Sequence, residues 1–191
     1  MTPTDEKGAT GLREDVADGI LAERAIDGDV AAFDLLCRRH VPMMRAYVAR
    51  MLRSISDADD VVQDSLLLAW RQLPTLRDPT SVRAWLMKIA SRQALTHVRR
   101  RAADHALPEW EIALPRETEP ENFAIRHAQL RALSTALDTL SDDQRQCWLL
   151  REIAELSYEQ IADELEISPS AVRGKLARAR ASVYTQMEGW R

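Results

Sequence analysis

Apolar side chains recur at helical spacing along most of this chain, and no stretch alternates apolar and polar residues as a half-buried strand does. The first stripe covers residues 31–52, where Pro42 marks a kink or a break. A second stripe predicts a helix over 58–73 whose buried face includes Trp70, and a third predicts a helix over 82–101. Only six glycines occur in 191 residues, which also favours helices. The pattern therefore predicts an all-α fold.

Serine residues mark the predicted helix starts. Ser56 with Asp59 forms a capping-box pattern, in which the serine and the third helical residue exchange hydrogen bonds with each other's backbone. Three further starts follow in the second half: Ser141 with Gln144, Ser157 with Gln160, and Ser168 with Pro169. They predict helices over 142–155, 158–165 and 169–186, with a turn at 166–168. A short helix, a tight turn and a longer helix form a helix-turn-helix.

The formal net charge of −4 hides an uneven distribution along the chain. Segment 1–22 carries −3, segment 23–102 carries +5, segment 103–122 carries −5 and segment 123–191 carries −1. Segment 103–122 also contains three prolines and little periodicity, which is typical of an extended linker. We therefore expect a disordered N-terminal segment, a small basic helical domain, an extended acidic linker and a second small helical domain, with these bounds.

Composition and spacing exclude several classes of protein. There is no apolar run of the roughly 18 residues that a membrane span needs, and no secretory signal, so we expect a cytoplasmic protein without direct membrane insertion. No glycine-rich phosphate loop and no convergent catalytic set occurs, so we expect no enzyme and no cofactor. The cysteines lie far apart and are expected to be buried reduced thiols, and the histidines lack metal-ligand spacing, so no metal is expected. These residues are Cys37, Cys147, His40, His97, His105 and His127.

The last predicted helix is strongly basic, with no acidic residue before Glu188. The major groove of DNA admits one helix, whose N-terminal residues reach base edges while later residues meet phosphates. That geometry turns Ser170, Arg173, Gly174 and Ala177 toward bases, and Lys175, Arg178 and Arg180 toward the DNA backbone. Glycine inside a helix is unfavourable, and Gly174 is explained equally well by a close approach to DNA or by tolerated drift.

The basic domain contains the segments Asp57-Ala-Asp-Asp-Val-Val-Gln-Asp, Ser81-Val-Arg-Ala-Trp-Leu-Met-Lys-Ile-Ala and Arg99-Arg-Arg, with Trp70 between the first two. The last domain contains Leu140-Ser-Asp-Asp-Gln-Arg, Leu156-Ser-Tyr-Glu-Gln-Ile-Ala and the helix after Ile167. In this order and spacing they resemble regions 2 and 4 of the extracytoplasmic-function (group 4) sigma factors of the sigma-70 family. The resemblance covers residues 23–187. It implies an alternative sigma factor that binds core RNA polymerase and directs promoter-specific initiation, by recognising the −35 element and opening the −10 element.

The resemblance also assigns roles to particular positions. It places the polymerase-docking helix at Asp60, Gln63 and Asp64. It places the capture of a flipped −10 base at the loop 77–81, and the single-stranded −10 element along the helix that follows. The residues concerned are Arg77, Asp78, Ser81, Arg83, Lys88, Arg92, His97 and Arg99. Besides polymerase, duplex −35 DNA and single-stranded −10 DNA, it implies an anti-sigma factor as a partner. An unstacked base needs a pocket and a basic groove, which fits this composition.

Two departures from the family pattern limit what the resemblance implies. The family usually has glycine at the turn where Glu166 stands, so this turn is expected either to be strained or to differ slightly from the family's. The family often has asparagine at Arg92 and aspartate at Thr96, so no −10 base preference carries over. We assign Trp85 to the core rather than to base stacking, because it shares a helical stripe with Val82 and Ile89.

Other functions explain less of the chain. A stand-alone helix-turn-helix transcriptional regulator, or the output domain of a response regulator, would account for residues 141–186 but would leave the basic domain and the acidic linker without a role. A small helical enzyme has no supporting motif. A module that binds only proteins does not explain the basic last helix. Binding to core RNA polymerase separates the first alternative from the sigma factor.

Overall fold

The computed structural model describes residues 16–103 and 120–188, and these residues form helices without any β-strand. The first group contains α1 (Asp18–Ile26), α2 (Val30–Leu52), α3 (Ile55–Gln72) and α4 (Val82–Ala103), with two short 3₁₀ turns at Leu73–Thr75 and Pro79–Ser81. The second group contains α5 (Pro120–Asp138), α6 (Asp142–Glu152), α7 (Tyr158–Leu165) and α8 (Pro169–Met187). The all-α prediction is confirmed for the described residues.

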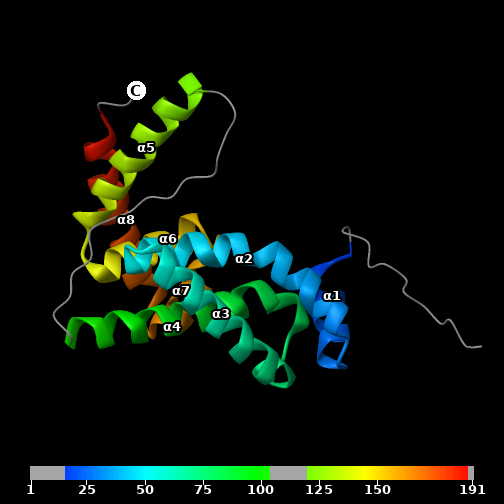
Figure 1. Cartoon of the computed structure of the whole chain (residues 1–191). Helices are drawn as coiled ribbons and strands as arrows, with labels where there is room; N and C mark the ends of the chain where they lie inside the picture. The colour runs from blue at the N-terminus through cyan, green and yellow to red at the C-terminus, as the bar shows by residue number, and fades with distance from the viewer. Residues whose placement is uncertain (1–15, 104–119, 189–191) are drawn as a thin grey trace, which may run out of the picture.

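Helices α2, α3 and α4 pack side by side, and α1 lies across one end of them (Figure 1). Their contact faces are filled by large side chains with little or no exposure, among them Leu36, Met44, Tyr47, Leu86 and Met87. Burying such side chains stabilises a fold by about 1.5–3 kcal/mol each. This burial explains why α2 continues through Pro42, because fully buried Leu36 and Met44 hold the helix on both sides of the hydrogen bond that proline removes.

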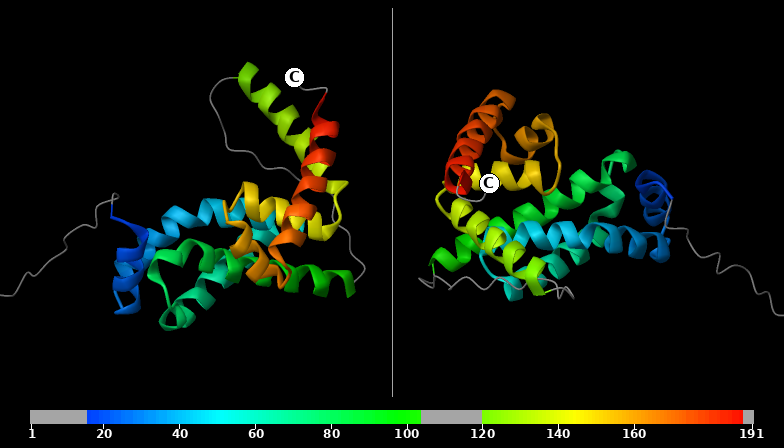
Figure 2. Two further views of the ribbon diagram at one scale, coloured as in Figure 1. Left: turned by 180° about the vertical axis from the view of Figure 1, so that it is seen from behind. Right: turned by 90° about the horizontal axis from the view of Figure 1, so that it is seen from above.

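Helices α7 and α8 form the helix-turn-helix, α6 packs against both, and α5 runs beside α8 (Figures 1 and 2). Both predicted capping boxes are present, Ser141 with Gln144 and Ser157 with Gln160, and Ser168 caps α8 ahead of Pro169. The buried guanidinium of Arg145 donates to the carbonyl oxygens of Leu137, Asp138 and Leu140, at 2.9, 3.3 and 3.3 Å. These carbonyls lie at or just beyond the end of α5, where the carbonyl oxygens of a helix lack N–H donors within the helix. Arg145 therefore fixes the corner between α5 and α6.

Three local predictions were wrong in position. Helix α1 starts at Asp18, inside the segment 1–22 that was expected to be disordered, because Leu21 and Ala22 are fully buried and the Asp18 carboxylate pairs with Arg39. Residues 1–15 lie outside the described part. Helix α3 starts at Ile55 with Ser54 as its N-cap, so Ser56 is not the cap. Helix α6 ends at Glu152.

Three further predictions concern the bounds of the linker, the burial of the cysteine thiols and the absence of a membrane span. Helix α4 extends to Ala103, two residues beyond its predicted end, and α5 opens at Pro120, inside the segment 103–122 expected to be the linker; most of that segment lies outside the described residues. Cys37 and Cys147 are free thiols; Cys147 is buried and Cys37 only partly so. Burial raises the pKa of both thiols to about 11, which keeps them protonated at neutral pH. No helix in the described ranges is long and apolar enough to cross a bilayer.

The turn between α7 and α8 has the expected strain. Glu166 ends α7 with φ +55° and ψ +40°, a left-handed conformation in which a residue with a Cβ is destabilised by about 1–2 kcal/mol. Replacing Glu166 by glycine removes this strain but gives the unfolded chain more conformational freedom, worth about 0.4–1 kcal/mol. We therefore expect Glu166→Gly to raise the free energy of unfolding by about 0.5–1 kcal/mol, measured by urea denaturation.

The matched control is Glu159→Gly, which places the same change at an exposed, right-handed position of α7. There glycine is expected to lower the free energy of unfolding by about 0.5–1 kcal/mol. Equal effects of the two substitutions would show that the turn carries no strain.

Candidate nucleic-acid interface

Helix α8 presents one buried and one exposed face. Val172, Leu176 and Ala179 pack into the core, whereas the predicted DNA-contacting residues lie on the solvent side or at its edge. Ser170, Arg173, Ala177, Arg178 and Arg180 are exposed, and Gly174 and Lys175 are partly buried. A Cβ placed on Gly174 would meet only the Arg178 guanidinium, at 3.6 Å, so packing within the chain does not require glycine there.

Two of the predicted phosphate contacts are already paired within the chain. Lys175 Nζ lies 2.6 Å from a carboxylate oxygen of Asp143, and Arg180 Nη2 lies 2.8 Å from one of Glu152, both on α6. Such exposed pairs contribute about 0–1 kcal/mol, so a phosphate can displace them. Arg173 and Arg178 have no ion-pair partner within the described ranges. These two arginines are therefore the cations of α8 most available to a ligand.

The loop that leads into α4 is held by the Asp78 carboxylate. It accepts hydrogen bonds from the backbone N–H and the hydroxyl of Thr80, at 3.0 and 2.7 Å, and from the hydroxyl of Ser81, at 2.7 Å. These donors favour the ionised carboxylate and lower the pKa of Asp78 below its ordinary value. The side chains of Asp78 and Ser81 thus fix the loop rather than point freely at a ligand.

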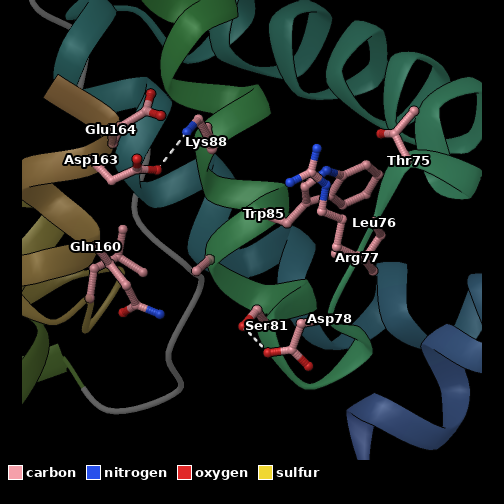
Figure 3. A pocket seen from close by; sticks show the side chains of 12 residues that line it. Thr75, Leu76, Arg77, Asp78, Ser81, Trp85, Lys88, Gln160, Asp163 and Glu164 are labelled. Carbon is pink, nitrogen blue, oxygen red and sulfur yellow. Dashed lines mark hydrogen bonds and ion pairs between the residues drawn. The ribbon is translucent and has the colours of Figure 1, made fainter. Parts of the chain in front are cut away.

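A cavity of about 470 Å³ lies beside this loop (Figure 3). The loop contributes Arg77, Asp78 and Ser81, and α4 contributes Trp85 and Lys88. The opposite wall comes from α7 and the segment before it. Trp85 packs against the hydrophobic core, as predicted, but it is only partly buried and also lines the cavity. An aromatic ring beside two cations is a suitable wall for a nucleobase.

Cations of α4 pair with carboxylates of the second helical group. Arg83 Nη2 lies 2.9 Å from Glu155, Lys88 Nζ lies 2.7 Å from Asp163, and Arg92 Nε lies 3.8 Å from Glu164. A second groove, of about 680 Å³, separates Arg92 and Arg99 from α6 and from the turn before α8.

Glu164 differs from the other two carboxylates that face α4, because its side chain is buried. Its side chain is 3% exposed, and its carboxylate oxygens accept no hydrogen bond from any described residue. Burial raises the pKa of Glu164 to about 7, although Arg92 and Lys88 act in the opposite direction. Nearby, the Ser91 hydroxyl accepts from Gln146 Nε2 at 3.2 Å and is hydrogen-bonded to the Tyr47 hydroxyl at 3.1 Å.

The predicted −10 residues do not all share one surface. Arg77, Asp78, Ser81 and Lys88 line the cavity beside the loop, and Arg92 and Arg99 line the second groove. His97 instead faces α3, with its Nε2 3.6 Å from the Asp57 carboxylate, which Arg101 also contacts. The structure thus brings six of the eight candidates to the two grooves, places Arg83 at Glu155 and separates His97 from them.

The predicted polymerase-docking residues lie on one exposed face of α3. Asp60, Gln63 and Asp64 are exposed, and they share this face with Leu67, which is 52% exposed. Trp70 was expected to be buried but is 38% exposed, and its ring packs against Phe33 with centroids 5.0 Å apart. The sequence analysis missed Leu67 as a surface residue, although it follows Gln63 by four positions and therefore lies on the same helical face.

Comparisons with known proteins agree with this architecture. Residues 36–103 match the family described as Sigma-70 region 2, and residues 130–183 match Sigma-70, region 4. The chain is 30% identical to the ECF RNA polymerase sigma-E factor of Salmonella typhimurium over 187 residues, covering 93% of this chain and 97% of that protein. It is 30% identical to the RNA polymerase sigma-H factor of Pseudomonas aeruginosa over 173 residues, covering 85% and 90%.

Solved structures show the same arrangement. A structure of CnrH in complex with the cytosolic domain of CnrY superimposes with a TM-score of 0.68 and 28% identity, over 91% of this chain and 99% of CnrH. RpoE of Bartonella quintana shares the fold, with a TM-score of 0.70 over 83% of this chain and 98% of RpoE, at 23% identity. Both sigma-70 regions, in this order and over nearly the full length of the relatives, establish the assignment: the chain belongs to the extracytoplasmic-function sigma factors of the sigma-70 family, alternative sigma factors that bind core RNA polymerase and promoter DNA and direct the initiation of transcription.

Proposed function

We propose that the two helical groups of this sigma factor bind different promoter elements. The exposed face of α8 reads duplex DNA at the −35 element, and α4 with the loop 77–81 binds the separated −10 strand. The observation that carries the proposal is the cavity beside that loop, where Arg77, Lys88 and the partly buried Trp85 combine two cations with an aromatic wall. Single-stranded nucleic acid is bound by this combination of a basic groove and an aromatic platform.

The same proposal assigns the bounds of the domains and the cellular compartment in which the protein works. Residues 23–102 act as the polymerase and −10 domain, residues 123–191 act as the −35 domain, and the acidic segment between them is the linker. The protein works in the cytoplasm, where RNA polymerase is, and contributes binding energy rather than a catalytic group of its own. A stand-alone helix-turn-helix regulator remains the alternative to test, since it would bind DNA without polymerase.

An anti-sigma factor is the proposed regulatory partner. One similar structure holds CnrH with the cytosolic domain of CnrY, and the other holds RpoE with the anti-sigma factor NepR. The likeness to CnrH, at 28% identity over 91% of this chain, supports a partner of the same kind here.

The exposed face of α3 is the proposed contact with the clamp of core polymerase. It combines the carboxylates of Asp60 and Asp64 with apolar Leu67, so that charge guides the approach and the leucine buries its surface. We expect core polymerase to yield run-off transcript from the chain's own promoter only when this chain is added, and equal product with and without the chain would contradict the assignment. Leu67→Asp should reduce that transcript at least about tenfold, because a carboxylate would be buried against polymerase without a partner.

Leu67 is half exposed, so Leu67→Asp should leave the melting temperature of the free chain nearly unchanged. Gln72→Asp, at an exposed position beyond this face, is the matched control. Polymerase-independent transcriptional control, or a Leu67→Asp variant that transcribes normally, would contradict the assignment of this face.

Arg173 and Arg178 should behave differently on −35 DNA. Arg173 lies in the second turn of α8, where base edges are within reach, and Arg178 lies more than one turn later. We expect Arg173→Ala to lose about 1–3 kcal/mol on the preferred sequence and to relax the base preference. Arg178→Ala should weaken binding to all sequences alike and reduce the slope of log K against log salt by about one. Identical behaviour of both variants across sequences and salt would refute this division.

Gly174 provides a test of close approach. No described side chain needs the space beside it, so Gly174→Ala should raise the free energy of unfolding by about 0.5–1 kcal/mol. If the helix backbone lies against DNA, the added methyl group should at the same time lower −35 affinity in the holoenzyme, measured by filter binding. Higher stability with unchanged affinity would show that glycine has no role at the interface.

A further inference from the structure

Three carboxylates of the second helical group face the cations of α4. We call Glu155, Asp163 and Glu164 the acidic edge; it comprises the end of α7 and one residue between α6 and α7. The edge meets Arg83, Lys88 and Arg92 in the same order along both segments. All three cations belong to the set proposed for the −10 strand.

The acidic edge occupies the positions that phosphates would need. The pairs Arg83–Glu155 and Lys88–Asp163 are 2.9 and 2.7 Å long, the length of charge-assisted hydrogen bonds, which phosphate oxygens would form equally well. In Figure 3, Asp163 reaches Lys88 across the cavity, and Gln160 and Glu164 stand on the same side. A DNA strand laid along α4 would have to displace these side chains.

We propose that in the free chain the acidic edge competes with single-stranded DNA for α4 and so keeps the −10 surface closed until polymerase is bound. The inference rests on the proposed function of α4. A cation that holds a carboxylate at hydrogen-bonding distance cannot hold a phosphate in the same place, so closure and strand binding exclude each other. The sigma factor would then be prevented from binding exposed single strands without polymerase.

The ion pairs of the closure are weak enough to be released. Asp163 and Glu155 are 78% and 68% exposed, so their ion pairs are screened by water and salt. Buried Gln146 and Ser91 add one neutral hydrogen bond between the groups, and Arg53 pairs with Asp138 at 2.9 Å. Contacts of this kind can be replaced when polymerase binds both helical groups.

Glu164 makes the closure depend on pH. The groups around it are Arg92, Lys88 and Ser91 on α4, Tyr47 on α2, Gln146 on α6 and its neighbour Asp163. Its pKa is about 7 in the closed arrangement, whereas an exposed glutamate titrates near 4.5. Protonation therefore favours closure: the stabilisation is complete below about pH 4.5 and is lost as the pH rises through 7.

The decisive experiment measures binding of a fluorescent single-stranded DNA of mixed sequence to the free, full-length chain by anisotropy. The double variant Glu155→Gln/Asp163→Asn should bind about three- to tenfold more tightly than the wild type, as expected when two exposed pairs are lost. The control Glu23→Gln/Asp27→Asn removes two exposed carboxylates of the α1 region that form no ion pair with α4 among the described residues. Small-angle scattering should show a larger radius of gyration for the first variant only.

Substituting Glu164 should have the opposite effect, although it also removes a carboxylate. Glu164→Gln mimics the protonated form, so it should bind the oligonucleotide more weakly than the wild type at pH 8. Between pH 6 and pH 8 the ratio of wild-type to variant affinity should rise by up to about tenfold, because a group with a pKa of 7 titrates in this range. Histidines titrate in both proteins, so their effect cancels in the ratio.

Two outcomes would overturn the closure: an acidic-edge variant that gains no more affinity than its control, or a Glu164→Gln variant that binds more tightly at pH 8. Failure of the proposed function is detected separately, with Arg92→Ala in the holoenzyme on promoter DNA that is already open. If that substitution has no effect, α4 does not hold the −10 strand. If it weakens binding while the free-chain variants behave like their controls, only the closure is wrong.

Discussion

The Ser91 hydroxyl is the point where the two helical groups meet in the interior. It accepts from Gln146 of the second group and is hydrogen-bonded to Tyr47 of the first, all three being buried. A buried hydroxyl without partners would be destabilising by about 1–3 kcal/mol, so this small network sets which faces of α2, α4 and α6 can oppose one another. The ion pairs between α4 and the acidic edge lie along the same contact between the two helical groups.

This arrangement gives α4 two different sides. One side packs on α3, where Asp57 holds Arg101 and lies near His97. The other side faces the acidic edge across the grooves and carries Lys88, Arg92 and Arg99. The side that faces outward from the first helical group is thus basic, and in the absence of other molecules the chain itself supplies the counter-charge.

Local signals in the sequence predicted much of this fold, and long-range ones did not. The caps at Ser141, Ser157 and Ser168 were found because a serine and its partner lie within three residues. The pairing of Lys88 with Asp163 spans 75 positions, and no periodicity reveals it. The same limit applies to Trp70, whose stripe indicated burial although no element covers it completely, and to Asp18, whose partners lie in α2.

The buried arginine at the α5–α6 corner has a consequence for promoter architecture. Arg145 binds the last carbonyls of α5 from within α6, and α5 also packs along α8, so α5 and α8 move as one rigid piece. The corner at residues 139–141 is therefore not a hinge, and different spacer lengths between promoter elements cannot be accommodated by a change of angle between α5 and the recognition helix.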